Sequence, residues 1–171
     1  MGTCTIDKPV RCDALKTERS DATTAIQYMQ AARTAGALIS IDASSTAVLR
    51  DFGVDRYAAL IASIGPDVFL CNSDEAELLN IDSAHPIPGA ELTVIKRGAL
   101  PVTAVTAAGA VTEIATPPVA NIVDTTGAGD AFAAGFLPTY SSTRKIADAI
   151  THGNSIAARV LRSPGATLDA R

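Results

Sequence analysis

The chain has 171 residues, of which 47% are hydrophobic and 19% are charged, and its formal net charge at pH 7 is −4. This length suits one globular domain with a substantial core, and the composition excludes a disordered chain. The negative charge gives no basic footprint for nucleic acid, and no apolar run approaches the ~18 residues that a membrane-spanning helix needs.

The cysteines and the start of the chain bear on its compartment. Cys4, Cys12 and Cys71 show no metal-ligand spacing and no Cys-x-x-Cys pair, which is typical of a reducing compartment. The opening residues lack the apolar core of a signal peptide. We therefore expect a cytoplasmic protein without nucleic-acid or membrane partners.

Residues 1–20 are polar, carry Pro9 and isolated charges, and predict an unstructured or loop-like start. Residues 21–171 predict a single α/β domain. Its first helix is expected after Ser20, which can cap it, because apolar residues then recur at helical spacing as far as Gly36, a typical helix-ending glycine.

Alternating strands and helices follow. Residues 37–42 and 68–71 predict strands, residues 57–64 predict a helix, and residues 43–55 predict a loop. This alternation predicts parallel strands joined by right-handed crossovers, with any ligand at the carboxyl ends of the strands. Asp42 and Asn72 are the polar residues expected at that edge.

The segment Asn72-Ser-Asp-Glu75 opens another helix. Its spacing fits a capping box, in which Asn72 and Glu75 each accept from the other's backbone N–H group, and spacing alone favours this structural interpretation. Residues 92–96 then predict a strand that ends in Lys96. Taken alone, Lys96 is typical of a solvated lysine at a strand end.

The remaining regular elements are a hairpin and a long helix. Residues 102–107 and 111–115 flank Ala108-Gly109 and predict the hairpin. Residues 144–161 predict the helix, with apolar residues recurring on one face. Gly153 is costly there, by ~1 kcal/mol relative to Ala, unless another helix or a planar ligand approaches closely, and a helix is the favoured alternative.

The stretch with the most specific chemistry lies between the hairpin and the last helix. We predict a strand over residues 121–123, a glycine turn, and a short helix over residues 131–137 that Pro138 ends. In such a turn, backbone N–H groups converge on one point, and the helix dipole favours an anion there. The converging N–H groups are those of Gly127, Ala128 and Gly129.

Asp130 follows this turn directly. A carboxylate beside a phosphate site is well placed to accept a proton from an attacking hydroxyl, although an Asp at a helix start is more often only a cap. Two other glycine motifs are excluded, because Phe132 occupies a glycine position of a dinucleotide fingerprint and residues 134–136 lack the Gly-Lys-Ser/Thr of a Walker A loop. The pattern indicates phosphoryl transfer.

The stretch resembles the second signature of the ribokinase-like (PfkB) carbohydrate kinase family, Asp-Thr-x-Gly-Ala-Gly-Asp-x-Phe. The matching residues are Asp124, Thr125, Gly127, Ala128, Gly129, Asp130 and Phe132. The resemblance implies an ATP-dependent carbohydrate kinase that acts on a sugar or nucleoside, with a three-layer α/β/α fold and a mostly parallel sheet. It further implies that Gly127, Ala128 and Gly129 form the anion hole for the transferred phosphate and that Asp130 is the catalytic base.

The resemblance also implies roles for residues at other strand and helix ends. Asn72 and Glu75 would support a Mg²⁺ and phosphate site through water. Lys96 and Gly98 would line the nucleotide, and Asn154, reached by counting back from Pro164-Gly165-Ala166, would lie beside the adenine. Asp124 and Thr126 match a monovalent-cation site, for K⁺, that some members carry.

The resemblance runs from about residue 20 to residue 166 and corresponds to the C-terminal half of the family. The N-terminal strands and the lid have no counterpart in residues 1–20. A non-catalytic remnant, or a nucleotide-binding or assembly module of the family, therefore stays open as the alternative function. The absent strands would also leave an exposed sheet edge that favours homo-oligomers.

Overall fold

The structure, a computed structural model, describes residues 19–165 and the side chains of residues 24–165. The loop-like start expected for residues 1–20 lies almost wholly outside the described residues. Described elements follow one another in the order α1 (Arg19–Thr34), β1 (Ser40–Asp42), α2 (Thr46–Phe52), α3 (Val54–Ile64), β2 (Val68–Asn72), α4 (Ser73–Leu78), β3 (Leu92–Lys96), β4 (Val102–Thr106), β5 (Val111–Ile114), α5 (Ala128–Thr143) and α6 (Ile146–Val160).

The strands form one five-stranded sheet in the order β1-β2-β3-β4-β5. β1, β2 and β3 are parallel, whereas β3, β4 and β5 are antiparallel, so the sheet is mixed. In the parallel part Leu70 pairs with both Asp42 and Val94. The predicted α/β class and the predicted β4–β5 hairpin are confirmed.

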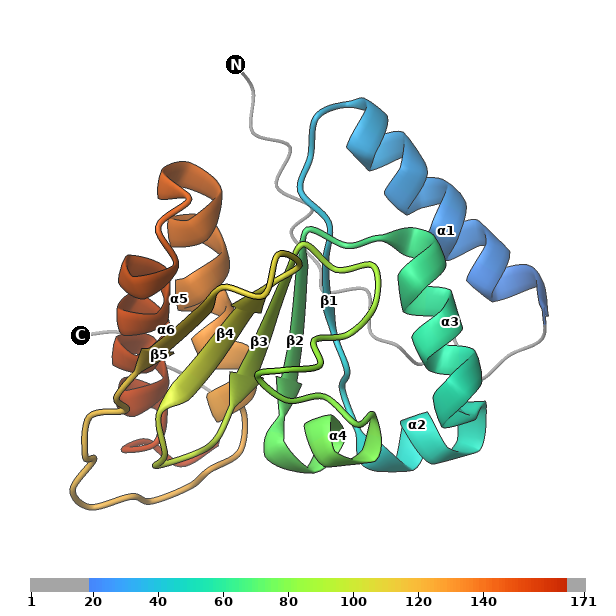
Figure 1. The fold of residues 1–171 in the computed structure, drawn as a ribbon. Helices are drawn as coiled ribbons and strands as arrows, with labels where there is room; N and C mark the ends of the chain where they lie inside the picture. The colour runs from blue at the N-terminus through green and yellow to red at the C-terminus, as the bar shows by residue number, and fades with distance from the viewer. Residues whose placement is uncertain (1–18, 166–171) are drawn as a thin grey trace.

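Helices cover both faces of the sheet, as Figure 1 shows, with α5 and α6 on one side and α1, α2 and α3 on the other. Successive residues of β2 point to opposite faces, which explains two separate cores. Val68 and Leu70 pack toward α5 and α6, while Phe69 and Cys71 pack toward α2 and α3. The arrangement is the three-layer α/β/α fold expected from the sequence.

α5 and α6 pack closely because each contributes a glycine to the contact. A Cβ atom added to Gly153 would lie 2.8 Å from the Phe132 ring, and one added to Gly135 would lie 2.9 Å from the His152 carbonyl oxygen. Real Cβ atoms are not found at such distances, so only glycine permits this approach. The favoured explanation of Gly153, contact with another helix, is confirmed.

The loop predicted over residues 43–55 is wrong, because α2 and the start of α3 occupy it. Ser45 caps α2, its side chain accepting from the Ala47 N–H at 3.2 Å, and Leu49 is the fully buried residue of the helix. Seven residues with one buried position give too short a pattern to reveal helical periodicity. Local capping and tertiary burial form the helix here.

The strand predicted over residues 121–123 is also wrong. Ile122 and Val123 are more than half exposed and lie in irregular backbone, although β-branched residues favour strands. Within the described residues the sheet ends at β5 and offers this segment no partner strand. Instead, the Val123 N–H donates to the Leu161 carbonyl oxygen at 2.8 Å.

Pro138 does not end the helix that follows the glycine turn. α5 continues through it to Thr143 and carries Phe136 and Tyr140, buried against the sheet, on either side of the proline. Proline inside a helix removes one backbone hydrogen bond and costs ~3 kcal/mol. Burial of these aromatic side chains offsets that cost. The prediction from the sequence took account of the proline but not of this burial.

The outer helix boundaries differ from prediction by a few residues. α1 begins at Arg19, so Ser20 lies within the helix and not at its cap. Gly36 ends α1 as predicted: it has φ +82°, and the Ala37 N–H donates to the Ala32 carbonyl oxygen at 3.0 Å. α6 begins at Ile146, because Arg144 adopts φ +56° and ends α5.

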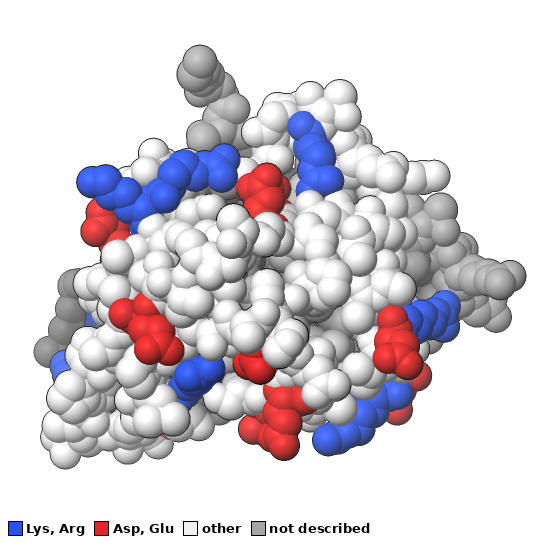
Figure 2. Space-filling model, in the orientation of Figure 1, with Lys and Arg blue, Asp and Glu red and all other residues white. Residues whose placement is uncertain are grey.

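Surface charges on the face drawn in Figure 2 are mixed, with acidic and basic side chains interspersed. Within the part of the chain that the structure describes, no helix combines the length and apolarity needed to cross a membrane.

Candidate phosphate site at the sheet edge

The start of α5 is an uncapped helix N-terminus. Gly127 is the N-cap residue with φ +76°, a conformation that favours glycine, and it provides no side-chain cap. Its carbonyl oxygen accepts from the Ala131 N–H at 2.8 Å. The N–H groups of Gly129 and Asp130 therefore have no acceptor within the helix and point, with the positive end of the dipole, out of its first turn.

Asp130 is the third residue of α5, and its side chain is exposed. It does not cap the helix, since Gly127 holds that position, so the structural explanation weighed for Asp130 is wrong. One of the three predicted N–H donors is engaged elsewhere: the Ala128 N–H donates to the Thr125 carbonyl oxygen at 3.3 Å. At this length the bond is weak. The Asp130 N–H group is a further donor of the first turn, next to that of Gly129.

Asp124 fixes the loop that leads into this turn. Its Oδ1 accepts from the Thr126 N–H at 2.9 Å and its Oδ2 accepts from the Gly165 N–H at 3.1 Å. The bond from the Thr126 backbone, followed by those from the Thr126 side chain and Gly165, lowers the pKa of Asp124. The loop is thereby tied to the end of α6. The monovalent-cation role predicted for Asp124 and Thr126 stays a prediction.

Lys96 reaches the same turn from the end of β3. Its Nζ donates to Asp42 Oδ2 at 2.7 Å, across the intervening strand β2, and its side chain is only 14% exposed. A Cβ atom added to Gly129 would lie 3.4 Å from Lys96 Nζ. The expectation of an ordinary solvated lysine is wrong, because Asp42 and the α5 turn enclose the ammonium group.

Asn72 and Glu75 form the capping box that their spacing predicts. The Asn72 N–H donates to Glu75 Oε2 at 2.8 Å, and the Glu75 N–H donates to Asn72 Oδ1 at 2.9 Å. Glu75 is 2% exposed, and this burial raises the pKa of its carboxyl group; the Asn72 bond lowers it, and nearby Asp42 raises it. The box leaves Glu75 Oε1 as a second acceptor, so a water-mediated Mg²⁺ role stays a prediction.

The two other residues expected at the nucleotide lie in different settings. Gly98 follows β3 with φ +60°, and a Cβ atom added to it would meet no atom within 4 Å. Asn154 is buried on α6, where its Nδ2 lies 3.5 Å from the Ala115 carbonyl oxygen. Their nucleotide-binding roles also stay predictions.

The fold brings several of these groups to one edge of the sheet. Asp42, Asn72 and Lys96 stand at the carboxyl ends of β1, β2 and β3, and Gly129 at the start of α5 meets Lys96 there. Figure 1 shows these strand ends pointing toward α4. The sequence predicted Asp42 at this edge but not its ion pair with Lys96. The available signal was two opposite charges at the ends of strands predicted to be parallel.

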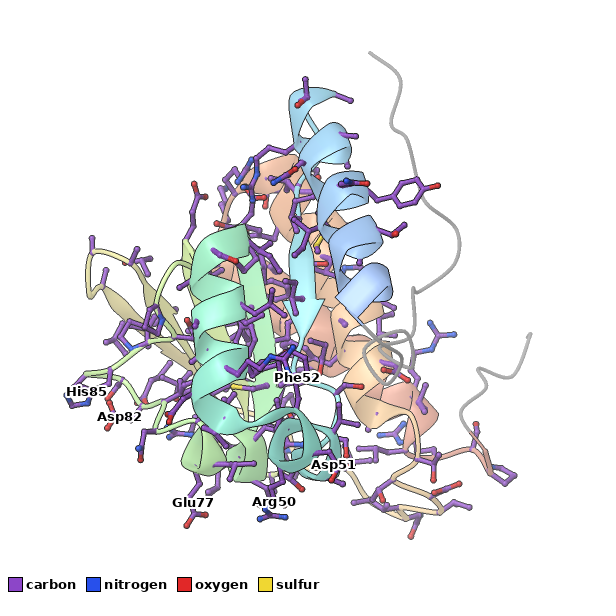
Figure 3. The ribbon with its side chains drawn as sticks, turned by 90° about the vertical axis from the view of Figure 1, so that its right-hand side faces the viewer. Arg50, Asp51, Phe52, Glu77, Asp82 and His85 are labelled. Atoms are coloured by element: carbon purple, nitrogen blue, oxygen red, sulfur yellow. The ribbon has the colours of Figure 1, made fainter. Side chains whose placement is uncertain are left out.

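A neighbouring cleft of about 590 Å³ opens between α2 and α4. It is lined by Thr46, Arg50, Asp74, Glu77 and Leu78 and contains none of the predicted site residues. Arg50 and Glu77, labelled in Figure 3, project from the same end of the molecule. Among the side chains that the structure describes, those of residues 24–165, no three His, Cys, Asp or Glu are grouped so that they could hold a metal ion.

Fold and site together define an α/β protein with an uncapped helix start at the carboxyl edge of its sheet. The sequence matches the pfkB family carbohydrate kinases over residues 15–171. The chain belongs to this family, as the Asp124 to Phe132 signature implied.

Individual relatives are kinases. A 2-dehydro-3-deoxygluconokinase of Haemophilus influenzae is 44% identical over 52 residues, which are 30% of this chain and 17% of the relative. An adenosine kinase from Sinorhizobium meliloti superposes with a TM-score of 0.77 at 22% identity, covering 88% of this chain and 47% of that one. An aminoimidazole riboside kinase from Salmonella enterica was solved with aminoimidazole riboside and an ATP analogue. It superposes with a TM-score of 0.74 at 27% identity, covering 91% of this chain and 56% of that one.

These similarities confirm the ribokinase-like fold. The chain spans about half the length of the solved kinases that it matches.

Proposed function

We propose that the chain carries the phosphoryl-transfer site of an ATP-dependent carbohydrate kinase, a phosphotransferase with an alcohol group as acceptor. One observation carries the proposal: the uncapped first turn of α5 has N–H donors without helical acceptors and carries Asp130, and the Lys96 ammonium lies beside Gly129 of that turn. Donors and a cation suit a phosphate, while a base at the same place suits the hydroxyl that attacks it.

The residues at the turn fit a nucleotide phosphate bound with Mg²⁺. When bound, Mg·ATP supplies the phosphoryl group, and the metal offsets part of its negative charge. The Gly129 N–H and its neighbours in the turn would hold phosphate oxygens, and the Oε1 acceptor of Glu75 and the Asn72 amide suit a metal that keeps most of its waters. Gly98, Asn154 and the backbone of Lys96 are proposed to line the nucleotide, and Asp124 with Thr126 to hold K⁺.

Asp130 would act as the base. Its carboxylate is exposed, so an acceptor hydroxyl can approach it, and it lies one residue from Gly129 in the same turn. It would accept the hydroxyl proton as the oxygen attacks, while the donors of the turn stabilise charge on the transferred group.

The acceptor class is a sugar, sugar acid or nucleoside. The support comes from the family and from relatives named for 2-dehydro-3-deoxygluconate, adenosine and aminoimidazole riboside. A screen of these three acceptors with simple hexoses and pentoses would identify the substrate.

The test is Asp130→Asn, which keeps the shape of the side chain and removes the base. Transfer from Mg·ATP to the best acceptor should fall by about 10²–10⁴-fold while ATP affinity is retained. Asp55→Asn is the matched control, because Asp55 is also an exposed acidic residue in the first turn of a helix. Unchanged transfer in Asp130→Asn would refute the assignment of the base.

A second candidate is a nucleotide-binding or assembly module that does not transfer phosphate alone. The two edges of the described sheet favour it. β1 and β5 are the outermost strands of the sheet, and such edges favour association, including homo-oligomers. ATP binding without transfer to any acceptor in the screen would select this candidate.

A further inference from the structure

We propose that Lys96 contributes its side-chain ammonium to the phosphate site and that Asp42 is the positioning residue that holds this ammonium over Gly129. The inference rests on the proposed function and deepens it. It assigns to the Lys96 side chain a contact with the transferred phosphoryl group and gives Asp42, which no motif singled out, a reason to stand at the end of β1.

Geometry is the first support. Lysine side chains ordinarily extend into water, but this one is 14% exposed and crosses the end of β2 to reach Asp42 Oδ2 at 2.7 Å. A Cβ atom added to Gly129 would lie only 3.4 Å from the same Nζ atom. An ammonium group has three donors, and Asp42 takes one, so donors remain for an anion at the turn.

Charge is the second support. The groups that surround Lys96 are acidic: Asp42 binds it, the buried Glu75 lies near it, and both interact with it electrostatically. Arg97 is the next residue along the chain and contributes positive charge to the same neighbourhood. Asp130 adds a further carboxylate in the α5 turn. A phosphate placed among these carboxylates needs a fixed cation, and Lys96 is the lysine positioned at that turn.

A purely structural ion pair is the alternative. A pair that only ties β1 to β3 would contribute stability, and its loss would weaken the binding of all ligands alike. A cation that contacts the terminal phosphate gives a different result. Because AMP lacks that phosphate, loss of the cation weakens ATP binding far more than AMP binding. The ratio of the two affinities therefore separates the alternatives.

The experiment measures dissociation constants for Mg·ATP and for AMP by calorimetry on the full chain. Lys96→Met should raise the constant for Mg·ATP about tenfold or more and leave that for AMP within about twofold, because a charge-assisted bond to phosphate is lost. Lys96→Arg, which keeps the charge, should recover most of the ATP affinity. Lys145→Met is the matched control, since Lys145 is 72% exposed and also pairs with an Asp, at 3.9 Å.

Asp42→Asn tests the positioning role. Because Asp42 acts through Lys96, the variant should weaken ATP binding less than Lys96→Met does. The double variant Asp42→Asn/Lys96→Met should bind ATP no worse than Lys96→Met alone, a non-additive result expected of coupled residues. Additive losses would overturn the positioning role.

The outcomes are distinguishable from those of the proposed function. If the unmodified chain binds Mg·ATP and Lys96→Met binds it equally well, this inference falls while the proposed function stands. If the unmodified chain does not bind Mg·ATP, both fall. If Lys96→Met does not fold, the Asp42→Asn and Lys96→Arg variants decide the question. Equal losses of affinity for ATP and for AMP in Asp42→Asn would overturn the inference.

Discussion

Glu75 is a buried carboxyl group whose contribution to stability depends on pH. Burial raises its pKa above the ordinary value of 4.5, and the raised pKa means that the folded chain binds the Glu75 proton more tightly than the unfolded chain does. Stability from this group is fully present below pH 4.5. It is lost as the pH rises through the raised pKa, because the folded chain must then hold a buried charge.

Glu75→Gln removes this titration and keeps an acceptor for the Asn72 N–H. The free energy of unfolding of the unmodified chain, minus that of Glu75→Gln, should therefore fall as the pH rises from about 4 to about 8. Urea unfolding of both chains at several pH values measures this difference in free energy. Glu77→Gln, on the exposed side of α4, is the matched control variant. A difference that grows with pH would contradict the direction of the pKa shift.

The pair α5–α6 is the element that holds the glycine turn in place, and its contact depends on Gly135 and Gly153. The turn precedes α5 directly, while Val123 and Asp124 bond to Leu161 and Gly165 after the end of α6. Separation of the two helices would move the first turn of α5 relative to Lys96. The distant glycine contact therefore supports the geometry of the proposed phosphate site.

Gly153→Ala tests this contact. Its methyl group would meet the Phe132 ring at 2.8 Å, so overpacking should outweigh the gain in helix propensity and cost about 1–3 kcal/mol of unfolding free energy. Ser155→Ala, two residues further along α6 and exposed, is the control and should change stability by about 0.5 kcal/mol at most. Stabilisation by Gly153→Ala would show that the helices are not packed this closely.

Elements with a periodic or strongly punctuated sequence were predictable. The strands at β2 and β3, the β4–β5 hairpin and the capping box at Asn72 follow from local patterns that the tertiary structure retains. α2 is too short to show a period, and Pro138 is overridden by burial of Phe136 and Tyr140. Residues 121–123 have strand propensity but no partner, which a local pattern cannot reveal.

The candidate site divides in the same way. The glycine turn and the position of Asp130 in it were predictable, because the backbone conformation there is specified within a few adjacent residues. The Lys96–Asp42 pair was not, because it joins residues 54 positions apart. Only the parallel order of β1, β2 and β3 brings them together. Charges at predicted strand ends were the one signal for it.

The chain as a whole is a family member that spans about half the length of the solved kinases. Phosphoryl transfer gains most from positioning and from exclusion of water. Binding of a phosphate needs fewer parts of the protein than transfer does. The proposed phosphate site uses only the edge formed by β1, β2, β3 and the start of α5. We therefore expect this edge to be assembled within residues 19–165 and to bind a nucleotide.

The most direct test is the thermal unfolding of the chain with and without Mg·ATP. A ligand that binds only the folded state raises its stability, by ~2.7 kcal/mol when its concentration is a hundred times the dissociation constant. We predict a cooperative transition whose midpoint rises with Mg·ATP concentration. A midpoint that is indifferent to Mg·ATP at every concentration would contradict the claim that the sheet edge and the α5 turn form a nucleotide site.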